Sequence, residues 1–131
     1  MISRVNDSTT APDAFADEDF CYITTTGRRT GNPHTIEIWF GVDRDVVYLM
    51  GGGRDRSDWV RNLMAHPSVR LQIGEHDWDA RARVVEAGTE EDARVRPLLR
   101  DKYANASDDL VSWARTALPV ALEVTGPASD G

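Results

Sequence analysis

Cysteine is almost absent from this 131-residue sequence, which has only Cys21, and no long apolar run occurs anywhere in it. One cysteine excludes an internal disulfide framework and a cysteine-rich zinc site. No stretch approaches the ~20 apolar residues that cross a bilayer, and from the polar first residues we expect no signal peptide. We therefore expect a cytoplasmic protein without an integral membrane segment, in which Cys21 is a small core residue.

Histidine and lysine are also scarce, with three histidines and a single lysine. His34, His66 and His76 have no metal-ligand spacing, so no metal site is predicted. A Gly-x-Ser-x-Gly nucleophile elbow and a Walker-type lysine loop are both missing. These absences exclude the commonest hydrolase and nucleotide-phosphate signatures.

Positive charge is in the minority but is concentrated locally. The chain has 15 basic against 22 acidic residues, a net charge of −7, which argues against nucleic-acid binding. Residues 22–70 nevertheless carry seven arginines against five acidic residues. This excess predicts a local anion-binding surface on an otherwise acidic protein.

The length is that of one domain. Residues 1–19 have a polar, aperiodic composition and are predicted to form a flexible N-terminal arm, with a short helix around residues 14–19. Residues 20–125 are predicted to form the folded domain, and residues 126–131 are predicted to be a loose tail.

Six strands and three helices are predicted from apolar periodicity and turn signals. The strands are 20–26, 34–42, 46–50, 69–73, 78–86 and 119–124, with 34–42 and 46–50 joined as a hairpin. The helices are 57–66, 89–103 and 108–116, the first burying Trp59, Leu63 and Met64. This order lacks the alternation of parallel βαβ units, so we expect a mainly β (α+β) antiparallel barrel with helices covering its ends.

Two segments rich in glycine and arginine are the candidate anion sites. The first, TTTGRRTGNP at residues 24–33, carries Arg28 and Arg29, and the second, GGGRDRSDW at residues 51–59, carries Arg54 and Arg56. Both follow strands, so a barrel could bring them to one rim. Read by spacing alone, they are equally compatible with two ordinary surface turns.

The second segment is expected to bind an anion more strongly than the first. Its glycine run allows close backbone approach, and it leads into a helix N-terminus with free N–H groups. Arg54 and Arg56 would add forked, charge-assisted hydrogen bonds. Asp55 and Asp58 oppose this, unless Asp55 pairs with Arg28 or Arg29.

The first segment resembles the TTTGRKTG-x-P signature of the deazaflavin-dependent nitroreductase family. Gly51-Gly52-Gly53, followed by Trp59, Asn62 and His66-Pro67-Ser68-Val69, is similar to the family's GG…W…N…NP-x-V segment. Ser112-Trp113 with Pro119-Val120 looks like its C-terminal end. The resemblance covers about residues 20–125.

The resemblance implies a split β-barrel of the pyridoxamine-phosphate-oxidase-like, flavin-binding type and the deazaflavin coenzyme F420 as cofactor. The residues it marks as cofactor-binding are Arg28, Arg29, His34, Thr35, Ile36, Gly52, Gly53, Arg54, Arg56, Trp59 and Asn62. It also implies a homodimer as one assembly. The sequence departs from the family in two places. Members usually carry a lysine in the loop before the helix, where this sequence has Arg54-Asp55-Arg56. Members also have several tyrosines before the Ser-Trp pair, where this sequence has only Tyr103.

The function expected from this resemblance is an F420-dependent oxidoreductase. It would transfer a hydride to a small electrophilic acceptor such as a quinone or a conjugated carbonyl, with the proton coming from Tyr103 or water. The alternatives are an FMN- or FAD-binding oxidoreductase on the same barrel, and a non-enzymatic protein that binds a cofactor or a lipophilic ligand.

Overall fold

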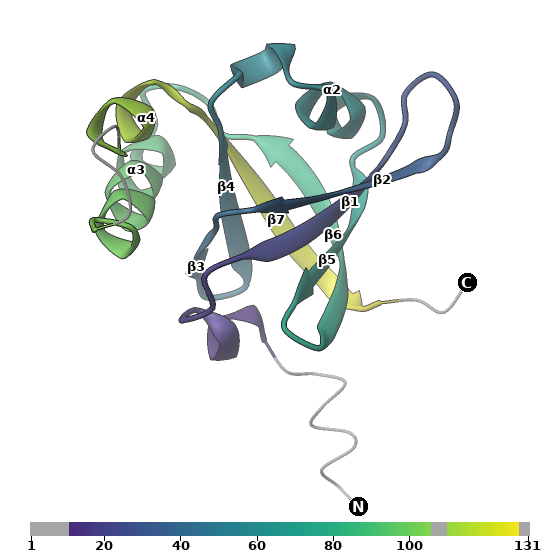
Figure 1. Ribbon diagram of the computed structural model, residues 1–131, viewed down its shortest axis with the longest axis horizontal. Helices are drawn as coiled ribbons and strands as arrows, with labels where there is room; N and C mark the ends of the chain where they lie inside the picture. Colours follow the sequence, from purple (N-terminus) through teal and green to yellow (C-terminus); the bar gives the residue numbers. More distant parts are fainter. Residues whose placement is uncertain (1–10, 106–109, 129–131) are drawn as a thin grey trace, which may run out of the picture.

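Seven strands form one antiparallel sheet in the computed structural model, which describes residues 11–105 and 110–128 (Figure 1). Their order across the sheet is β2-β1-β5-β6-β7-β4-β3. The strands are β1 Cys21–Thr26, β2 Pro33–Ile38, β3 Gly41–Asp43, β4 Val46–Gly51, β5 Ser68–Ile73, β6 His76–Val84 and β7 Leu118–Pro127.

The two edges of this sheet are adjacent in the chain, and this closes the barrel. β2 and β3 are the edge strands, yet only Trp39 and Phe40 separate them. Three successive Cα–Cα steps reach only about 11 Å. The sheet must therefore curl until its edges meet at this corner, and the predicted antiparallel split barrel is confirmed.

The single strand predicted at residues 34–42 is wrong, because the chain turns a corner at Phe40. The main-chain N–H of Phe40 donates to the hydroxyl of Tyr103 at 3.0 Å, and its carbonyl accepts from Lys102 Nζ at 3.0 Å. These partners replace the neighbouring strand that would otherwise satisfy Phe40. The predicted hairpin then forms only between β3 and β4, across the turn at residues 44–45.

Two apolar clusters fill the molecule, one on each face of β4 and β7. Inside the barrel, Val47, Leu49, Val120 and Leu122 pack with side chains from β1, β5 and β6. Outside it, Tyr48, Met50 and Ala121 pack against the helices. A strand covered on both faces needs apolar residues in succession rather than in alternation, which explains the continuous apolar runs of β4 and β7.

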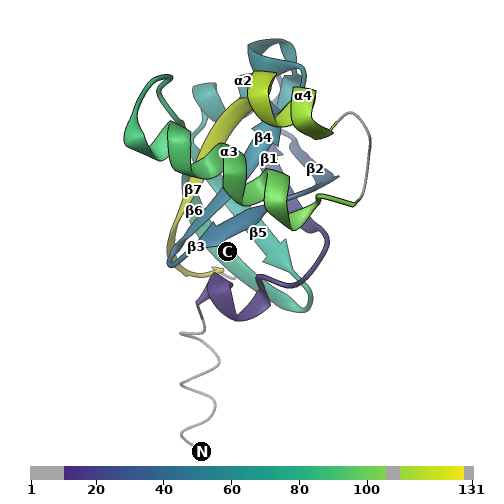
Figure 2. The same ribbon diagram turned by 90° about the vertical axis from the view of Figure 1, so that its left-hand side faces the viewer.

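In the described part of the chain, three α-helices surround the barrel: α2 Asp58–Ala65, α3 Glu90–Lys102 and α4 Leu110–Thr116. α2 lies over one end and buries Val60, Asn62 and Leu63. α3 and α4 lie side by side against the outer face near β3, β4 and β7, not over an end as expected (Figure 2). Met64, predicted to face inward, is 58% exposed.

The remaining differences concern short elements and chain ends. A 3-10 turn, η1, spans Pro12–Phe15, earlier than the predicted helix, and a second, η2, spans Arg54–Arg56. β7 continues to Pro127, beyond the predicted end at residue 124. Residues 1–10 of the predicted arm and 129–131 of the predicted tail lie outside the described residues. No helix within the described residues is both long and apolar enough to span a membrane.

Candidate functional site

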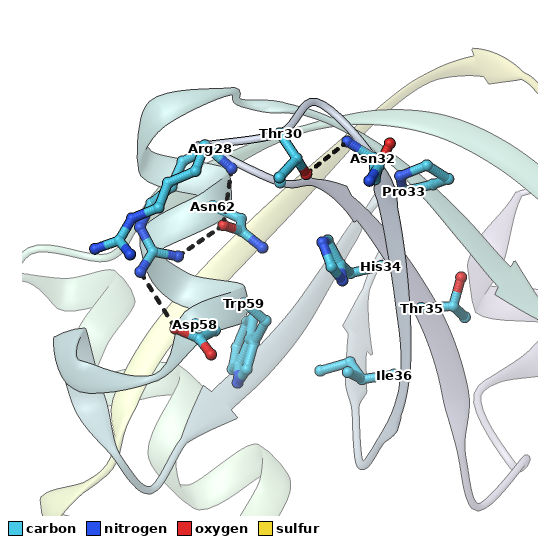
Figure 3. A pocket seen from close by; sticks show the side chains of 12 residues that line it. Arg28, Thr30, Asn32, Pro33, His34, Thr35, Ile36, Asp58, Trp59 and Asn62 are labelled. Carbon is cyan, nitrogen blue, oxygen red and sulfur yellow. Dashed lines mark hydrogen bonds and ion pairs between the residues drawn. The ribbon is translucent and has the colours of Figure 1, made fainter.

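A cavity of about 750 Å³ opens between β2, the turn that precedes it and helix α2 (Figure 3). It joins the first glycine–arginine segment to the helix that follows the second. The lining residues are Gly27, Arg28, Arg29, Thr30, Asn32, Pro33, His34, Thr35, Ile36, Asp58, Trp59 and Asn62.

The β1–β2 turn has a tight conformation that favours glycine at two positions. Its closing bonds run from Gly27 N–H to the carbonyl of Asn32, at 2.8 Å, and from Gly31 N–H to the carbonyl of Gly27, at 2.9 Å. Gly31 has φ +76°, in the left-handed region that favours glycine. A Cβ at Gly27 would lie 2.8 Å from the His34 ring. The two glycines thus let the turn fold closely over the start of β2.

Asn62 ties this turn to helix α2. Its side chain is buried, and Oδ1 accepts from the main-chain N–H of Arg28 at 3.1 Å and from Arg28 Nη1 at 2.9 Å. Its Nδ2 donates to Thr25 Oγ1 at 3.3 Å. The other arm of the Arg28 guanidinium pairs with Asp58 at 3.2 Å. The expected partner was Asp55; Asp58 occupies that role because it lies on the first turn of α2, facing the cavity.

The two arginines of the turn differ in whether their side chains already have hydrogen-bond or ion-pair partners. The Arg28 guanidinium donates to Asn62 and forms an ion pair with Asp58, and its side chain is only 23% exposed. Arg29 is exposed, and its side chain has no hydrogen bond or ion pair with any described residue. Arg29 lines the cavity together with Thr30 and Asn32 of the same turn. A guanidinium without a partner among the described residues makes this part of the cavity a place for an anion.

The middle of the cavity is flatter and more apolar. His34 and Ile36 point from β2 toward the half-buried indole of Trp59 on α2 (Figure 3). Thr35 points to the opposite side of the strand, where its hydroxyl lies 2.7 Å from that of Thr24. A planar ring could therefore lie between β2 and Trp59, with an anionic extension toward Arg29.

A second cavity, of about 420 Å³, lies farther along β2 and is largely apolar. It is lined by Phe20, Glu37, Ile38, Trp39, Met50, Leu110 and Trp113. Trp39 stacks on Tyr103 with ring centroids 4.2 Å apart and meets Trp113 edge-on at 5.5 Å. The acidic side chain in this lining, Glu37, accepts a 2.6 Å hydrogen bond from the Tyr22 hydroxyl, which raises the pKa of Tyr22.

Sequence reasoning did not find this apolar cavity. Its walls come from four separate parts of the chain, which no local pattern connects. One local signal was Trp39, a large aromatic that alternates in sequence with Thr35 and Glu37. Thr30, Asn32 and Asp58 were also not selected, although all three lie within the two glycine–arginine segments.

Five of the expected site residues lie outside the 750 Å³ cavity: Gly52, Gly53, Arg54, Arg56 and Tyr103. Gly52 lies beside Trp113, since a Cβ there would be 3.7 Å from its Cδ1. Arg54 donates from Nη1 to the carbonyl oxygen of Thr116. Arg56 is exposed, and its side chain makes no hydrogen bond or ion pair with the described residues. The structure thus places the first segment, and not the arginines of the second, at the cavity.

Tyr103 is buried at the corner of the barrel instead of at a cavity wall. Its hydroxyl accepts from the Phe40 N–H and lies 2.8 Å from the carbonyl of Asp19 and 3.0 Å from that of Phe40. Burial raises its pKa to about 12. A hydroxyl so engaged holds the β2–β3 corner and is poorly placed to donate a proton to an acceptor.

The curled antiparallel barrel has the fold of pyridoxamine-phosphate-oxidase-like split-barrel proteins. The fold of a putative pyridoxamine 5′-phosphate oxidase from Listeria innocua matches 86% of this chain and 89% of its own length, with a TM-score of 0.65 and 12% identity. An F420-H2-dependent reductase, FDR-A, matches 81% of this chain and 93% of its own, with a TM-score of 0.64 and 23% identity.

Residues 2–125 match the model of a family described as F420H(2)-dependent quinone reductase, and the chain belongs to this family. A relative with this activity in its name, from Mycobacterium tuberculosis, is 29% identical over 101 residues. The match covers 75% of this chain and 68% of the relative. The expected recognition of an F420-dependent split-barrel family is thereby confirmed, and the family's activity is enzymatic.

Proposed function

We propose that this protein binds reduced F420 in the cavity between β2 and α2 and uses it to reduce a small planar acceptor such as a quinone. The observation that carries the proposal is the composition of that cavity. At one end, Arg29 has no partner among the described residues, and Trp59 faces Ile36 in the middle. Membership of the quinone reductase family supports the same conclusion.

The side chains present fit the cofactor that the family implies. An anionic tail needs hydrogen-bond donors, which Arg29 and the Asn32 side-chain amide supply where the cavity is lined by the β1–β2 turn. The Thr30 hydroxyl accepts from the Asn32 main-chain N–H at 3.2 Å and keeps its own proton to donate. A planar ring needs flat apolar walls, which Trp59 and Ile36 supply. Asp58 places an acidic group in the same lining, and its charge is partly neutralised by Arg28 at 3.2 Å.

Reduced F420 supplies the hydride when bound, and the protein's own residues would position the two reactants. Trp59 and Ile36 would orient the ring. Trp39 and Trp113 would hold the acceptor in the apolar cavity beside the same strand and exclude bulk water from its faces. Because the Tyr103 hydroxyl is held by main-chain groups, we assign the proton to water at the cavity mouth.

Binding and turnover should be measured separately with the purified protein. Titration of F420, followed by its fluorescence, and of FMN under the same conditions distinguishes the two cofactors. Oxidation of reduced F420 by menadione, a small quinone, is then followed by the return of the deazaflavin absorbance. Tight FMN binding without F420 binding would favour the flavin alternative, and F420 binding without turnover of any acceptor would favour a carrier.

A homodimer stays a prediction from the family resemblance. Sedimentation of the purified protein with and without F420 tests it, and a monomer in both conditions would contradict it.

A further inference from the structure

Two guanidinium groups converge on the C-terminal end of helix α4. Arg96 Nη1 lies 3.1 Å from the carbonyl oxygen of Ala114 and 2.9 Å from those of Arg115 and Ala117. Arg54 Nη1 donates to the carbonyl oxygen of Thr116. The last carbonyls of a helix have no partner within the helix and carry its negative dipole end. Both arginines therefore satisfy groups that would otherwise be left to solvent.

These two arginines connect α4 to different parts of the molecule. Arg96 lies on the neighbouring α3 and is itself fixed by Asp92 one turn earlier, at 3.0 Å. Arg54 comes from η2, the segment between β4 and α2. It therefore links α4 to the chain segment that leads directly into the helix lining the proposed cofactor cavity.

The main chain at Arg54 is in an unfavourable conformation for its residue type. Its φ is +54°, in the left-handed region where glycine is much less strained. Glycine at position 54 would adopt this positive φ without strain, because it has no Cβ. In this conformation the Arg54 head group reaches α4, where it donates to the carbonyl oxygen of Thr116.

The position of α4 determines the shape of the apolar cavity. Leu110 and Trp113, both on α4, form one wall of it, and Trp39 and Met50 form parts of the others. Trp113 also lies against Gly52, where a Cβ would be 3.7 Å from its Cδ1. A change in the α4 position would therefore move the indole of Trp113 relative to Trp39.

We propose that Arg54 is a positioning residue for the acceptor cavity and not a ligand of the cofactor. The inference rests on the proposed function. By holding Thr116, the Arg54 guanidinium keeps α4, and with it Trp113, at the distance from β2 that a planar acceptor requires. The strand-to-helix segment η2 thereby couples the cofactor side of the molecule to the acceptor side.

The test compares Arg54→Ala and Arg54→Gly with Arg44→Ala. Arg44 is a matched control, since it is an exposed arginine with φ +61°, located in the β3–β4 hairpin away from both cavities. Both Arg54 variants should raise the KM for menadione about 3- to 10-fold, because a solvent-accessible charged hydrogen bond is lost. The F420 dissociation constant should stay within about twofold of the wild-type value, and Arg44→Ala should change neither.

Two variants, Arg54→Gly and Arg54→Lys, distinguish a positioning role of Arg54 from a general loss of stability. Arg54→Gly relieves the left-handed strain, so it should melt at or above the temperature of Arg54→Ala although both share the KM effect. Arg54→Lys, which retains one donor, should recover part of the menadione KM. Weaker F420 binding in Arg54→Ala with an unchanged menadione KM, or no change in either quantity, would overturn the inference. Failure of the wild-type protein to bind F420 would instead overturn the proposed function.

Discussion

Arg28 is bound twice by Asn62: the same Oδ1 accepts the Arg28 main-chain N–H at 3.1 Å and its guanidinium at 2.9 Å. One buried amide on α2 therefore orients both the backbone of the β1–β2 turn and its first arginine. Residues 34 positions apart in the chain are joined at the rim of the cavity. The basic end of the site thus depends on the packing of a helix against the barrel.

Asn62→Ala should destabilise the fold and weaken F420 binding together. The substitution leaves the Arg28 N–H and the Thr25 hydroxyl without their buried partner, which costs about 1–3 kcal/mol. Urea unfolding and F420 titration measure the two effects. Met64→Ala, at the exposed position two residues later on the same helix, should change the unfolding free energy by less than about 0.5 kcal/mol. Unchanged stability in Asn62→Ala would mean that water replaces the amide at no cost.

Arg29→Ala should reduce F420 affinity by about 10-fold at low salt, corresponding to ~1.4 kcal/mol. The loss should shrink at high ionic strength, since the charge is exposed and screened over ~8–10 Å. Calorimetric titration at two salt concentrations measures it. Arg56→Ala, outside the cavity, should have the smaller effect. A larger loss at Arg56 would restore the ranking of the two segments expected from the sequence.

Asp58→Asn should tighten F420 binding about 2- to 5-fold. Asp58 pairs with Arg28 at 3.2 Å, but its side chain is 85% exposed, so the pair contributes less than ~1 kcal/mol to stability. Removing the negative charge frees the Arg28 guanidinium for an anionic ligand while the amide keeps the shape. The same titration measures the gain, and weaker binding would show that Asp58 organises the site rather than opposing the anion.

Tyr103→Phe should lower stability while leaving turnover nearly intact. Loss of the hydroxyl leaves the buried Phe40 N–H without a partner, at a cost of about 1–3 kcal/mol. Thermal melting and menadione reduction by reduced F420 test the two parts. A variant that melts normally but turns over two or more orders of magnitude more slowly would instead support the proton-donor role expected for Tyr103 from the sequence.

Glu91 should contribute stability that is lost only in strong acid. Hydrogen bonds from Arg83 at 2.7 and 2.8 Å, aided by the Tyr48 hydroxyl, lower its pKa from an ordinary 4.5 to about 2. A lowered carboxyl pKa stabilises the fold above pH 4.5, and this contribution falls as the pH drops from 4.5 toward 2. Glu91→Gln should therefore be less stable than wild type at neutral pH and show a smaller change in unfolding free energy across the acid range from about pH 5 to about pH 2. Parallel curves for the two proteins would contradict this.

Several features of the protein could be inferred from local sequence. Helices α2 and α3 begin and end within a residue or so of their predicted limits, because caps, acidic first turns and proline act over a few neighbouring positions. The β1–β2 turn was identified from Gly27 and Gly31. The antiparallel class followed from the order of the elements. Arg28, Arg29 and Trp59, all chosen from the sequence, line the cavity.

Long-range packing decided the rest. The corner at Phe40 is stabilised by Tyr103, 63 positions away, whose hydroxyl accepts the Phe40 main-chain N–H. The alternating pattern of residues 34–42 gives no indication of that partner. The sequence favoured Arg54 over Arg29 as an anion ligand, because Arg54 follows a glycine run and precedes a helix. Curling of the sheet placed Arg29 on the cavity and brought Thr116 to Arg54. Periodicity reports which face of an element is buried, whereas the partner of a side chain depends on how distant segments meet when the barrel closes.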